Sequence, residues 1–317
     1  MQPKTGERTI INTENQKLLA GLHTLLGRPK PNIFYPGFAG YLFLSKTVRT
    51  QIQREAQGAK VLGISVGRIS KVELNYPSLV EQKKISSLLS TIDTRIQTQN
   101  KIIEQLESLI KALADSLIEY ETANSQSVEL GTIGASYNGL TGKTKEHFGS
   151  GERYIQYKQV FDNSCININS CGLVEVNENE SQNTVKFGDV IFTISSETPN
   201  EIGMSSVLLH EVERVYLNSF CFGFRPNELS EISPYFLRFY FRSSVFRNEL
   251  QKLAQGSTRY NISKTAFLKL RVKIPDIRKQ TKIANTLSAI DCKINIETGY
   301  LSLLINQKNW LLKNLFT

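Results

Sequence analysis

The sequence predicts a protein of the α+β class, with mixed α/β modules joined by two long antiparallel coiled-coil helices and a pseudo-two-fold internal repeat. The first observation behind this prediction is a repeated phrase, AQGAKVLGIS at 56–65 and AQGSTRYNIS at 254–263. The same interval of 198 residues pairs Pro77 with Pro275 and continues without a gap to the end of the second copy. A repeat of this period is too long for a solenoid and predicts two copies of a domain-sized module.

The second observation is a heptad pattern that follows the repeated phrase in each copy. Ser78 and Glu81 have the spacing of a capping box, and Asp276 can cap the second helix. Apolar residues then recur at alternating steps of four and three, as in a coiled-coil seam. The expected seam residues are Ile85, Leu89, Ile92, Ile96 and Gln99 in the first helix and Ile283, Leu287, Ile290, Ile294 and Glu297 in the second. We expect the two seams to pack antiparallel; the alternative is that each helix packs only on its own globular module.

These patterns divide the chain into four segments. We expect globular modules at 1–76 and 123–274 and helical spacers at 77–122 and 275–317. In the second module, strand-like runs at 188–195, 204–209 and 268–275 alternate with turns.

One helix is predicted over 233–256, where Ser233 and Pro234 suit a helix start. Its apolar residues recur roughly at helical spacing. Its Arg238, Arg242 and Arg247 are therefore expected to face outward.

Positive charge is concentrated rather than evenly spread. The formal net charge is +9, and residues 1–76 hold eleven Lys and Arg against four Asp and Glu. Residues 225–274 hold ten against three, whereas 123–224 hold six against twelve. A basic excess is often only a solvated face, but two matched excesses in equivalent segments favour a shared polyanionic partner.

The sequence offers no chemistry for catalysis or metal binding. The four cysteines have no C-x-x-C spacing, and the three histidines are scattered. No nucleotide fingerprint and no nucleophile–base spacing is found. No run of eighteen apolar residues and no signal peptide is present. We therefore expect a cytoplasmic binding protein without cofactor, metal or membrane contact.

Two polar loops of the second module are candidates for contact with nucleic acid. The loop 137–160 interleaves basic residues with tyrosines, and the loop 255–264 is rich in hydroxyls, amides and positive charge. Arg259 and Asn261 are the candidates for base contact, although a capping glycine followed by an ordinary polar turn would look similar. The candidate DNA-contact residues are Asn138, Thr141, Lys143, Lys145, Tyr157, Lys158, Gln255, Gly256, Ser257, Thr258, Arg259, Asn261 and Lys264, with Gln57, Gly58 and Lys60 in the first copy.

Three groups of motifs carry a resemblance to a known family. They are PSLVEQKKI at 77–85 with its echo PDIRKQTKI at 275–283, the stretch 130–160, and the runs GDVIFTISSE and AQGSTRYNIS. Together they resemble the specificity (S) subunit of Type I restriction-modification systems, which serve in bacterial defence. The resemblance implies a non-catalytic subunit with two target recognition domains, each of which binds one half of a split DNA sequence. It also implies that methyltransferase (M) subunits dock on the helical spacers and that nuclease-translocase (R) subunits join the complex.

The resemblance has one departure. A full first recognition domain would need roughly seventy more residues before Met1, so 1–76 is expected to be the distal half of an N-terminally truncated domain. A complementing fragment or self-association would then complete it. Two alternatives stay open, namely a non-catalytic coiled-coil assembly protein and an inactive truncated remnant.

Overall fold

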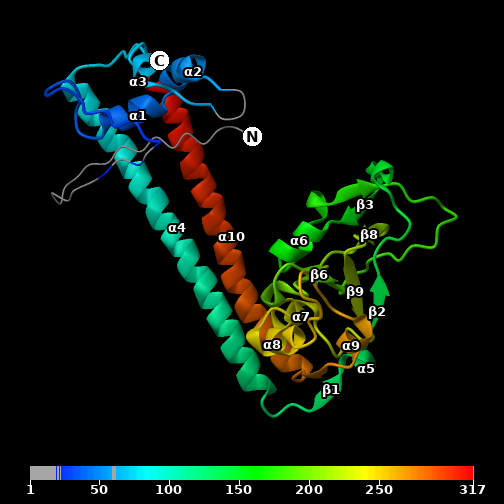
Figure 1. The fold of residues 1–317 in the computed structure, drawn as a ribbon. Coiled ribbons are helices and arrows are strands. Elements are labelled where there is room, and N and C mark those ends of the chain that lie inside the picture. The colour runs from blue at the N-terminus through cyan, green and yellow to red at the C-terminus, as the bar shows by residue number, and fades with distance from the viewer. Residues whose placement is uncertain (1–18, 20, 22, 59–61, 317) are drawn as a thin grey trace. The chain divides into compact units, whose positions relative to one another are not determined.

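The computed structural model describes Leu19, Gly21 and residues 23–58 and 62–316, and it divides into two compact units (Figure 1). Unit 1 comprises Met1–Gln105 and Ile294–Thr317, and unit 2 comprises Leu106–Lys293. The division cuts both long helices, so each unit contains a globular part together with one end of each helix.

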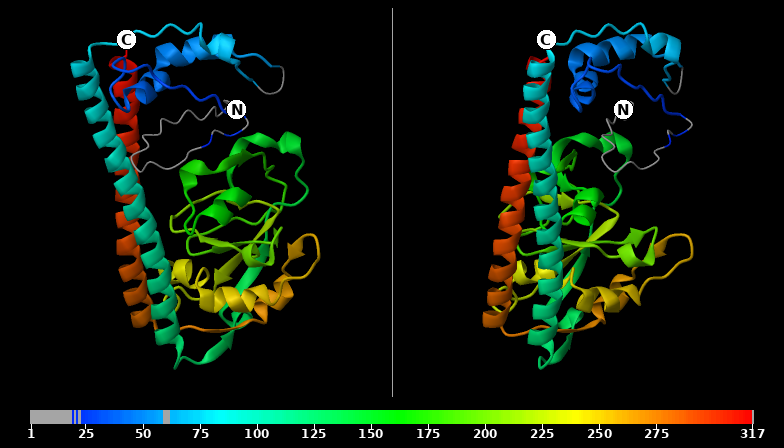
Figure 2. Two further views of the ribbon diagram at one scale, coloured as in Figure 1. Left: turned by 60° about the vertical axis from the view of Figure 1, so that its left-hand side comes forward. Right: turned by 90° about the vertical axis from the view of Figure 1, so that its left-hand side faces the viewer.

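The two long helices are α4 (Leu79–Thr122) and α10 (Ile277–Asn314), which lie side by side and antiparallel (Figure 2). In unit 1, Lys308 of α10 forms an ion pair with Asp93 of α4 at 2.5 Å. In unit 2, Lys279 near the start of α10 pairs with Glu121 near the end of α4 at 3.2 Å. The predicted fold class is confirmed.

The helices bury the seam that the heptad pattern marks out. In unit 1 the Gln99 side-chain amide donates to the Glu297 carbonyl oxygen at 3.1 Å and also to the Glu297 carboxylate. Gln99 is 5% exposed. A buried polar pair of this kind fixes the register of two helices, because any shift would leave both groups without partners. The buried seam residues are Ile85, Leu89, Ile92, Gln99, Ile283 and Leu287, and the half-buried ones are Ile96, Ile290, Ile294 and Glu297.

The globular part of unit 1 consists of short helices packed on the two long ones. These are α1 (Phe38–Leu44), α2 (Lys46–Glu55) and α3 (Val66–Ile69). Its core contains the buried residues Phe38, Leu42, Val48, Ile52, Ile85 and Leu89, against which Leu311, Leu312, Leu315 and Phe316 of the C-terminal segment pack. The start of α4 and the end of α10 therefore complete the core of this unit.

The globular part of unit 2 is built around a four-stranded antiparallel sheet in the order β2-β9-β5-β7. Its strands are β2 (Gly134–Asn138), β9 (Cys221–Pro226), β5 (Val190–Thr193) and β7 (Ser205–Val207). A three-stranded sheet holds β4 (Gly172–Val174), β3 (Phe148–Ile155) and β8 (Val215–Leu217). Two small pairs join β1 (Ser127–Glu129) to β11 (Arg271–Lys273) and β6 (Ser195–Ser196) to β10 (Tyr260–Asn261).

Short helices surround these sheets. They are α5 (Leu130–Ile133), α6 (Tyr157–Asp162), α7 (Pro234–Tyr240), α8 (Ser244–Gln251) and α9 (Lys264–Leu268), with 3₁₀ turns η1 (Lys145–His147), η2 (Ile168–Ser170) and η3 (Pro199–Glu201). Phenylalanines fill the core between the main sheet and these helices. Phe192 lies 4.8 Å from Phe267 and 5.1 Å from Phe241 between ring centroids. The core residues Ile283 and Leu287 of α10 pack in the same cluster.

The single helix predicted over 233–256 is wrong, because the structure has α7 and α8 with a break at 241–243. Ser243 causes the second start, since its hydroxyl accepts from the Phe246 N–H at 3.5 Å and donates to the Tyr240 carbonyl at 2.7 Å. A serine that can cap the next helix competes with continuation of the first.

The prediction that the three arginines of this segment face outward is also wrong. The Arg242 guanidinium donates to the carbonyl oxygens of Val160 and Phe161 in α6, of Asn163, and of Ser205 in β7. Arg247 donates to the Gly203 and Asn200 carbonyls at 2.8 Å. Burial lowers the pKa of both Arg242 and Arg247 to about 10. Arg238 pairs with Asp291 of α10 at 2.8 Å.

A buried glutamine joins each globular part to the helix that follows it. In unit 2 the Gln280 side chain, 1% exposed, accepts from the Ser233 N–H at 2.8 Å. Its amide donates to the carbonyls of Glu231 and Pro275 at 2.9 and 2.8 Å. One side chain therefore satisfies three backbone groups around the start of α10.

Unit 1 repeats this arrangement atom for atom. Gln82 accepts from the Tyr35 N–H at 2.8 Å and donates to the carbonyls of Ile33 and Pro77 at 3.1 and 2.8 Å. Each of these residues lies 198 positions before its counterpart in unit 2. The repeat seen in the sequence therefore extends to individual hydrogen bonds.

Replacement of either glutamine should destabilise the protein. Gln280→Ala or Gln82→Ala removes three hydrogen bonds to backbone groups that are mostly part-buried, and we expect a loss of about 2–4 kcal/mol in the free energy of unfolding. Urea unfolding measures the change. Gln105→Ala, at an exposed position of α4, is the matched control and should change stability by less than about 0.5 kcal/mol; equal effects of all three would contradict this role.

Candidate nucleic-acid interface

The loop of the repeated phrase in unit 2 is closed at its base and open at its tip. The Gln255 N–H donates to the Asn261 carbonyl at 3.1 Å, and the Asn261 N–H donates back to the Gln255 carbonyl at 2.9 Å. Residues 255–259 and Asn261 are exposed. Tyr260 and Asn261 also pair with β6, which anchors the loop to the body of unit 2.

Gly256 is required by this closure. Its φ of +128° lies in a region that other residues rarely adopt, and a Cβ there would lie 2.2 Å from the Arg259 carbonyl oxygen. The glycine therefore lets the loop turn back tightly, and it presents Ser257, Thr258 and Arg259 to solvent at fixed positions.

The corresponding loop of unit 1 has the same base. Gln57 and Gly63 exchange backbone hydrogen bonds of 2.9 and 2.8 Å, and Gly58 again has a positive φ of 142°. Gln57 and Gly58 are exposed. Lys60, the remaining candidate of the first copy, lies outside the described residues.

Tyr157 and Lys158 stand at the start of α6. The Tyr157 hydroxyl donates to the Ser195 carbonyl at 2.8 Å, and its ring stacks on Phe161 with 6.1 Å between centroids. Burial raises the pKa of Tyr157, so the hydroxyl stays a donor. Lys158 is exposed and pairs with Asp162 at 2.7 Å.

Three of the predicted residues, Tyr157, Lys158 and Arg259, meet at one cavity of about 480 Å³. Its lining residues are Tyr157, Lys158, Phe161, Asp162, Ser195, Ser196, Glu197, Glu201, Phe220 and Arg259. The cavity, hereafter the Phe220 cavity, unites the end of the first polar loop with β6 and the loop at 255–261. Sequence analysis missed Phe161, Phe220 and the two glutamates, because they are far apart in the chain and form no spaced motif.

The predicted loop 137–160 is only partly a loop, because η1, β3 and the start of α6 occupy 145–147, 148–155 and 157–160. Side-chain hydrogen bonds hold the part before η1. The Thr141 N–H donates to the side-chain oxygen of Gln182 at 3.1 Å. Asn138 is exposed, and its side-chain oxygen accepts from the Lys264 ammonium. Lys145 is exposed in η1. Asn138, Thr141, Lys145 and Lys264 do not line the Phe220 cavity.

The side chain of Lys143 is buried, although a DNA-contact residue is expected to be exposed. Its side chain is 4% exposed and its ammonium lies 2.6 Å from a carboxylate oxygen of Glu180. The hydrogen bond from Lys143 is the main cause that lowers the pKa of Glu180 from 4.5 to about 2. Lys143 therefore stabilises the loop as an internal ion pair and does not present a free charge to a partner.

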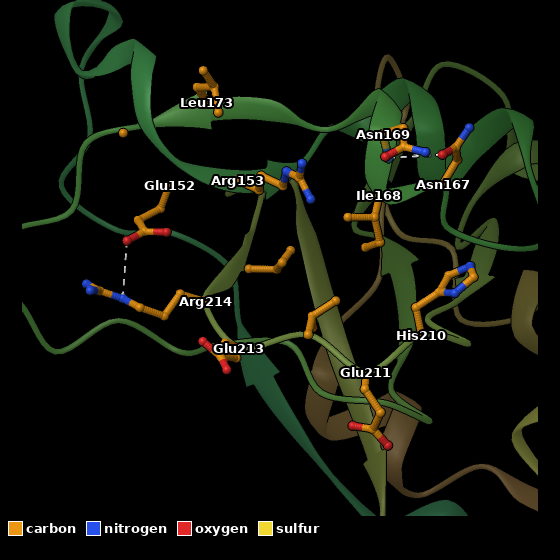
Figure 3. Close-up of a pocket in the computed structure, with 13 residues that line it drawn as sticks. Glu152, Arg153, Asn167, Ile168, Asn169, Leu173, His210, Glu211, Glu213 and Arg214 are labelled. Carbon is orange, nitrogen blue, oxygen red and sulfur yellow. Dashed lines mark hydrogen bonds and ion pairs between the residues drawn. The ribbon is translucent and has the colours of Figure 1, made fainter.

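A larger cavity of about 610 Å³ contains none of the predicted DNA-contact residues (Figure 3). Arg153 and the Glu152–Arg214 ion pair, at 3.4 Å, lie on one part of its wall, and Asn167, Asn169 and His210 lie on another. Acidic and basic groups are mixed there, so the cavity has no net preference for a polyanion.

The described residues offer no metal centre, since they contain no group of three or more His, Cys, Asp or Glu side chains placed to hold an ion. Within the same residues, no helix has the length and apolarity needed to cross a membrane. The arrangement can bind and orient a polar ligand through amides, hydroxyls, aromatic faces and guanidinium groups.

Comparison with known families decides the classification. The model of the Type I restriction modification DNA specificity domain matches residues 10–108 and 123–306, which is most of the chain. The chain belongs to this family. Members of this specificity family are generally non-catalytic.

Individual relatives agree with this classification. The specificity subunit of the Type I restriction enzyme MjaVIII of Methanocaldococcus jannaschii is 23% identical over 284 residues, which cover 81% of this chain and 64% of the relative. The specificity subunit of EcoKI of Escherichia coli is 21% identical over 286 residues, with 83% and 60% covered. The chain therefore spans less than two thirds of the length of these relatives.

A solved structure shows a similar fold. The S subunit of the Type I restriction-modification system of M. genitalium matches with a TM-score of 0.55 at 19% identity, over 91% of this chain and 74% of that chain. This chain and the M. genitalium S subunit therefore share a fold.

The Lys143–Glu180 pair predicts a pH dependence of stability. A carboxyl whose pKa is depressed on folding stabilises the protein above its unfolded pKa and loses that contribution as pH falls towards its folded pKa. We therefore expect Lys143→Met to be less stable than the wild type at pH 7, with a difference that shrinks between about pH 4.5 and pH 2. Urea unfolding at several pH values measures this difference.

The control for this experiment is Lys158→Met, which breaks an exposed pair and should change stability little. A carboxyl NMR titration in which Glu180 keeps its low pKa in Lys143→Met would refute the assignment.

Proposed function

We propose that the chain is the sequence-specific DNA-recognition subunit of a Type I restriction-modification complex and binds a split target. The observation that carries this proposal is the pair of glycine-closed loops, which recur with the same backbone hydrogen bonds in both copies. In this proposal 1–76 and 123–274 are the recognition modules, and 77–122 and 275–317 are the spacers between them. The complex acts in the cytoplasm, where double-stranded DNA is available.

The two polar loops have different roles in this proposal. Lys145 and Lys158 are exposed cations suited to phosphate, which binds any sequence alike. Arg259 and Asn261 stand on a rigid loop, and a guanidinium or amide there can form bidentate bonds to a base edge. The rigid base of the loop favours specificity, because a preorganised side chain loses little entropy on binding.

The long helices supply a surface for the M subunits. On α10, within unit 1, Ile296, Tyr300, Leu303 and Trp310 follow steps of four, three and seven and are 61%, 45%, 66% and 63% exposed. These residues, the α10 stripe, lie on a helix face that the α4 contact does not use. An exposed apolar stripe of this kind is typical of a protein-binding surface. R subunits then join through the assembled complex.

The first test is methylation in cells that make the chain with its cognate M subunit. We expect an asymmetric split motif in the methylated genomic DNA.

Arg259→Ala should reduce the preference for one base of the motif, by about 1–3 kcal/mol in the free energy of DNA binding. Lys145→Ala should instead weaken binding to all sequences alike and reduce the salt slope by about one. DNA-binding titrations at several salt concentrations measure both effects.

Lys269→Ala, which removes an exposed lysine outside both polar loops, is the control and should leave the motif unchanged. Absence of sequence-dependent methylation and binding at every salt concentration would contradict the proposal and favour a non-catalytic coiled-coil assembly protein or an inactive remnant.

The second test uses Trp310, the single tryptophan of the chain. With 5-fluorotryptophan in this chain alone, addition of unlabelled M subunit should shift the ¹⁹F resonance as the ring becomes buried. Trp310→Ala should weaken M binding at least tenfold, because large aromatic residues dominate protein interfaces. Tyr120→Ala removes an exposed aromatic of α4 and should leave M binding unchanged; equal losses would place the interface elsewhere.

A further inference from the structure

The Phe220 cavity is lined by an aromatic residue that is largely exposed to solvent. The Phe220 side chain is 59% exposed, yet its backbone is fixed on both sides. Its N–H donates to the Asn218 side-chain oxygen at 2.8 Å, and its carbonyl accepts from the Ile194 N–H at 3.0 Å. More than half of this aromatic side chain is therefore available to a ligand of the cavity, on a backbone that is held in place.

A second aromatic wall faces the same cavity. Tyr157 and Phe161 line it from α6, with nearly parallel rings at an interplanar angle of 19°. The hydrogen bond from the Tyr157 hydroxyl to Ser195 fixes the orientation of this wall. The volume of about 480 Å³ lies within the range of sites for small planar ligands. Aromatic faces of this kind stack on any base.

The polar groups of the cavity select the class of base. Glu197, Glu201 and Asp162 line it with carboxylates, which only accept hydrogen bonds and repel phosphate. Thr198 donates to Glu201 at 2.8 Å and orients that carboxylate, and Lys158 neutralises Asp162. Carboxylates accept from exocyclic amino groups, namely N4 of cytosine, N6 of adenine and N2 of guanine, whereas thymine has none. Lys158 provides a cation for an adjoining phosphate, and Arg259 keeps its contact with a neighbouring base edge.

We propose that the Phe220 cavity binds one unstacked base of the target half-site, one that carries an exocyclic amino group, with Phe220 stacked on its face. This base is additional to the one that the M subunit methylates. The proposal rests on the proposed DNA-recognition function and adds a specificity-determining contact to it. A base that leaves the duplex sacrifices its stacking and pairing, and the two aromatic walls together with the carboxylates replace those interactions.

The test uses the complex of this chain with its M subunit and duplexes that carry the methylated motif. 2-Aminopurine replaces each adenine, pyrrolocytosine each cytosine and 6-methylisoxanthopterin each guanine of the half-site, one at a time, because the fluorescence of these analogues rises when they unstack. We expect a rise at one position besides the methylated base. Phe220→Ala should abolish that rise and weaken DNA binding roughly 5- to 150-fold, the range for one stacked base.

Three further variants separate aromatic stacking from the effect of apolar bulk. Phe220→Trp keeps an aromatic face and should retain the fluorescence rise, whereas Phe220→Leu keeps only apolar bulk and should lose it. Tyr235→Ala removes an aromatic of similar exposure, 48%, which does not line the cavity, and it should behave as the wild type. Thermal melting of each variant verifies that the fold is retained.

The outcomes distinguish this inference from the proposed function. If the wild-type complex binds and methylates one motif but no second position brightens, the cavity proposal is overturned and the DNA-recognition function stands. Wild-type affinity in Phe220→Ala, or a full rise in Phe220→Leu, would overturn it as well. Failure of the wild-type complex to bind any sequence preferentially would overturn the proposed function itself.

Discussion

The packing of each globular part on one end of each long helix is the constraint on which the structure depends. In unit 1 the core needs Leu89 from the start of α4 and Leu311 from the end of α10. In unit 2 it needs Leu287 from the start of α10 and Leu117 from the end of α4. Neither core is closed by its own segment of chain alone. The helix pair is therefore part of both cores and cannot separate without exposing both.

Buried polar groups define how these parts fit together. Gln82 and Gln280 each satisfy three backbone groups where a globular part meets its helix, and Gln99 with Glu297 fixes the register of the helices. Each pairing stabilises only one arrangement, because a displaced partner would leave a buried polar group unsatisfied. Arg242 acts in the same way within unit 2, where it joins the turn between α7 and α8 to the carbonyls of Asn163 and of Ser205 in β7. A specificity subunit benefits from such rigidity, since contacts to bases require fixed positions.

Some basic residues form hydrogen bonds inside the fold, and others are exposed on the surface. The segment 225–274 is rich in positive charge, but Arg225, Arg238, Arg242 and Arg247 hold carboxylates and carbonyls inside unit 2. What remains for a partner is a smaller set on exposed loops, with Arg259 beside an aromatic cavity. Net charge alone therefore overstates the basic surface that is open to a partner, because location determines which cations are exposed.

The sequence by itself determined the repeat, the two long helices and the family, because these depend on periodicity and on local motifs that survive in one dimension. It also located the loop at 255–261, whose Gly256 is needed for a tight turn. Only the tertiary structure decided that Lys143 pairs with Glu180, that 233–256 breaks at Ser243, and that Phe220 and Glu197 share a cavity with Arg259. Those outcomes depend on which distant groups meet. A buried donor takes whatever acceptor the fold brings within reach, and no spacing in the sequence records that meeting.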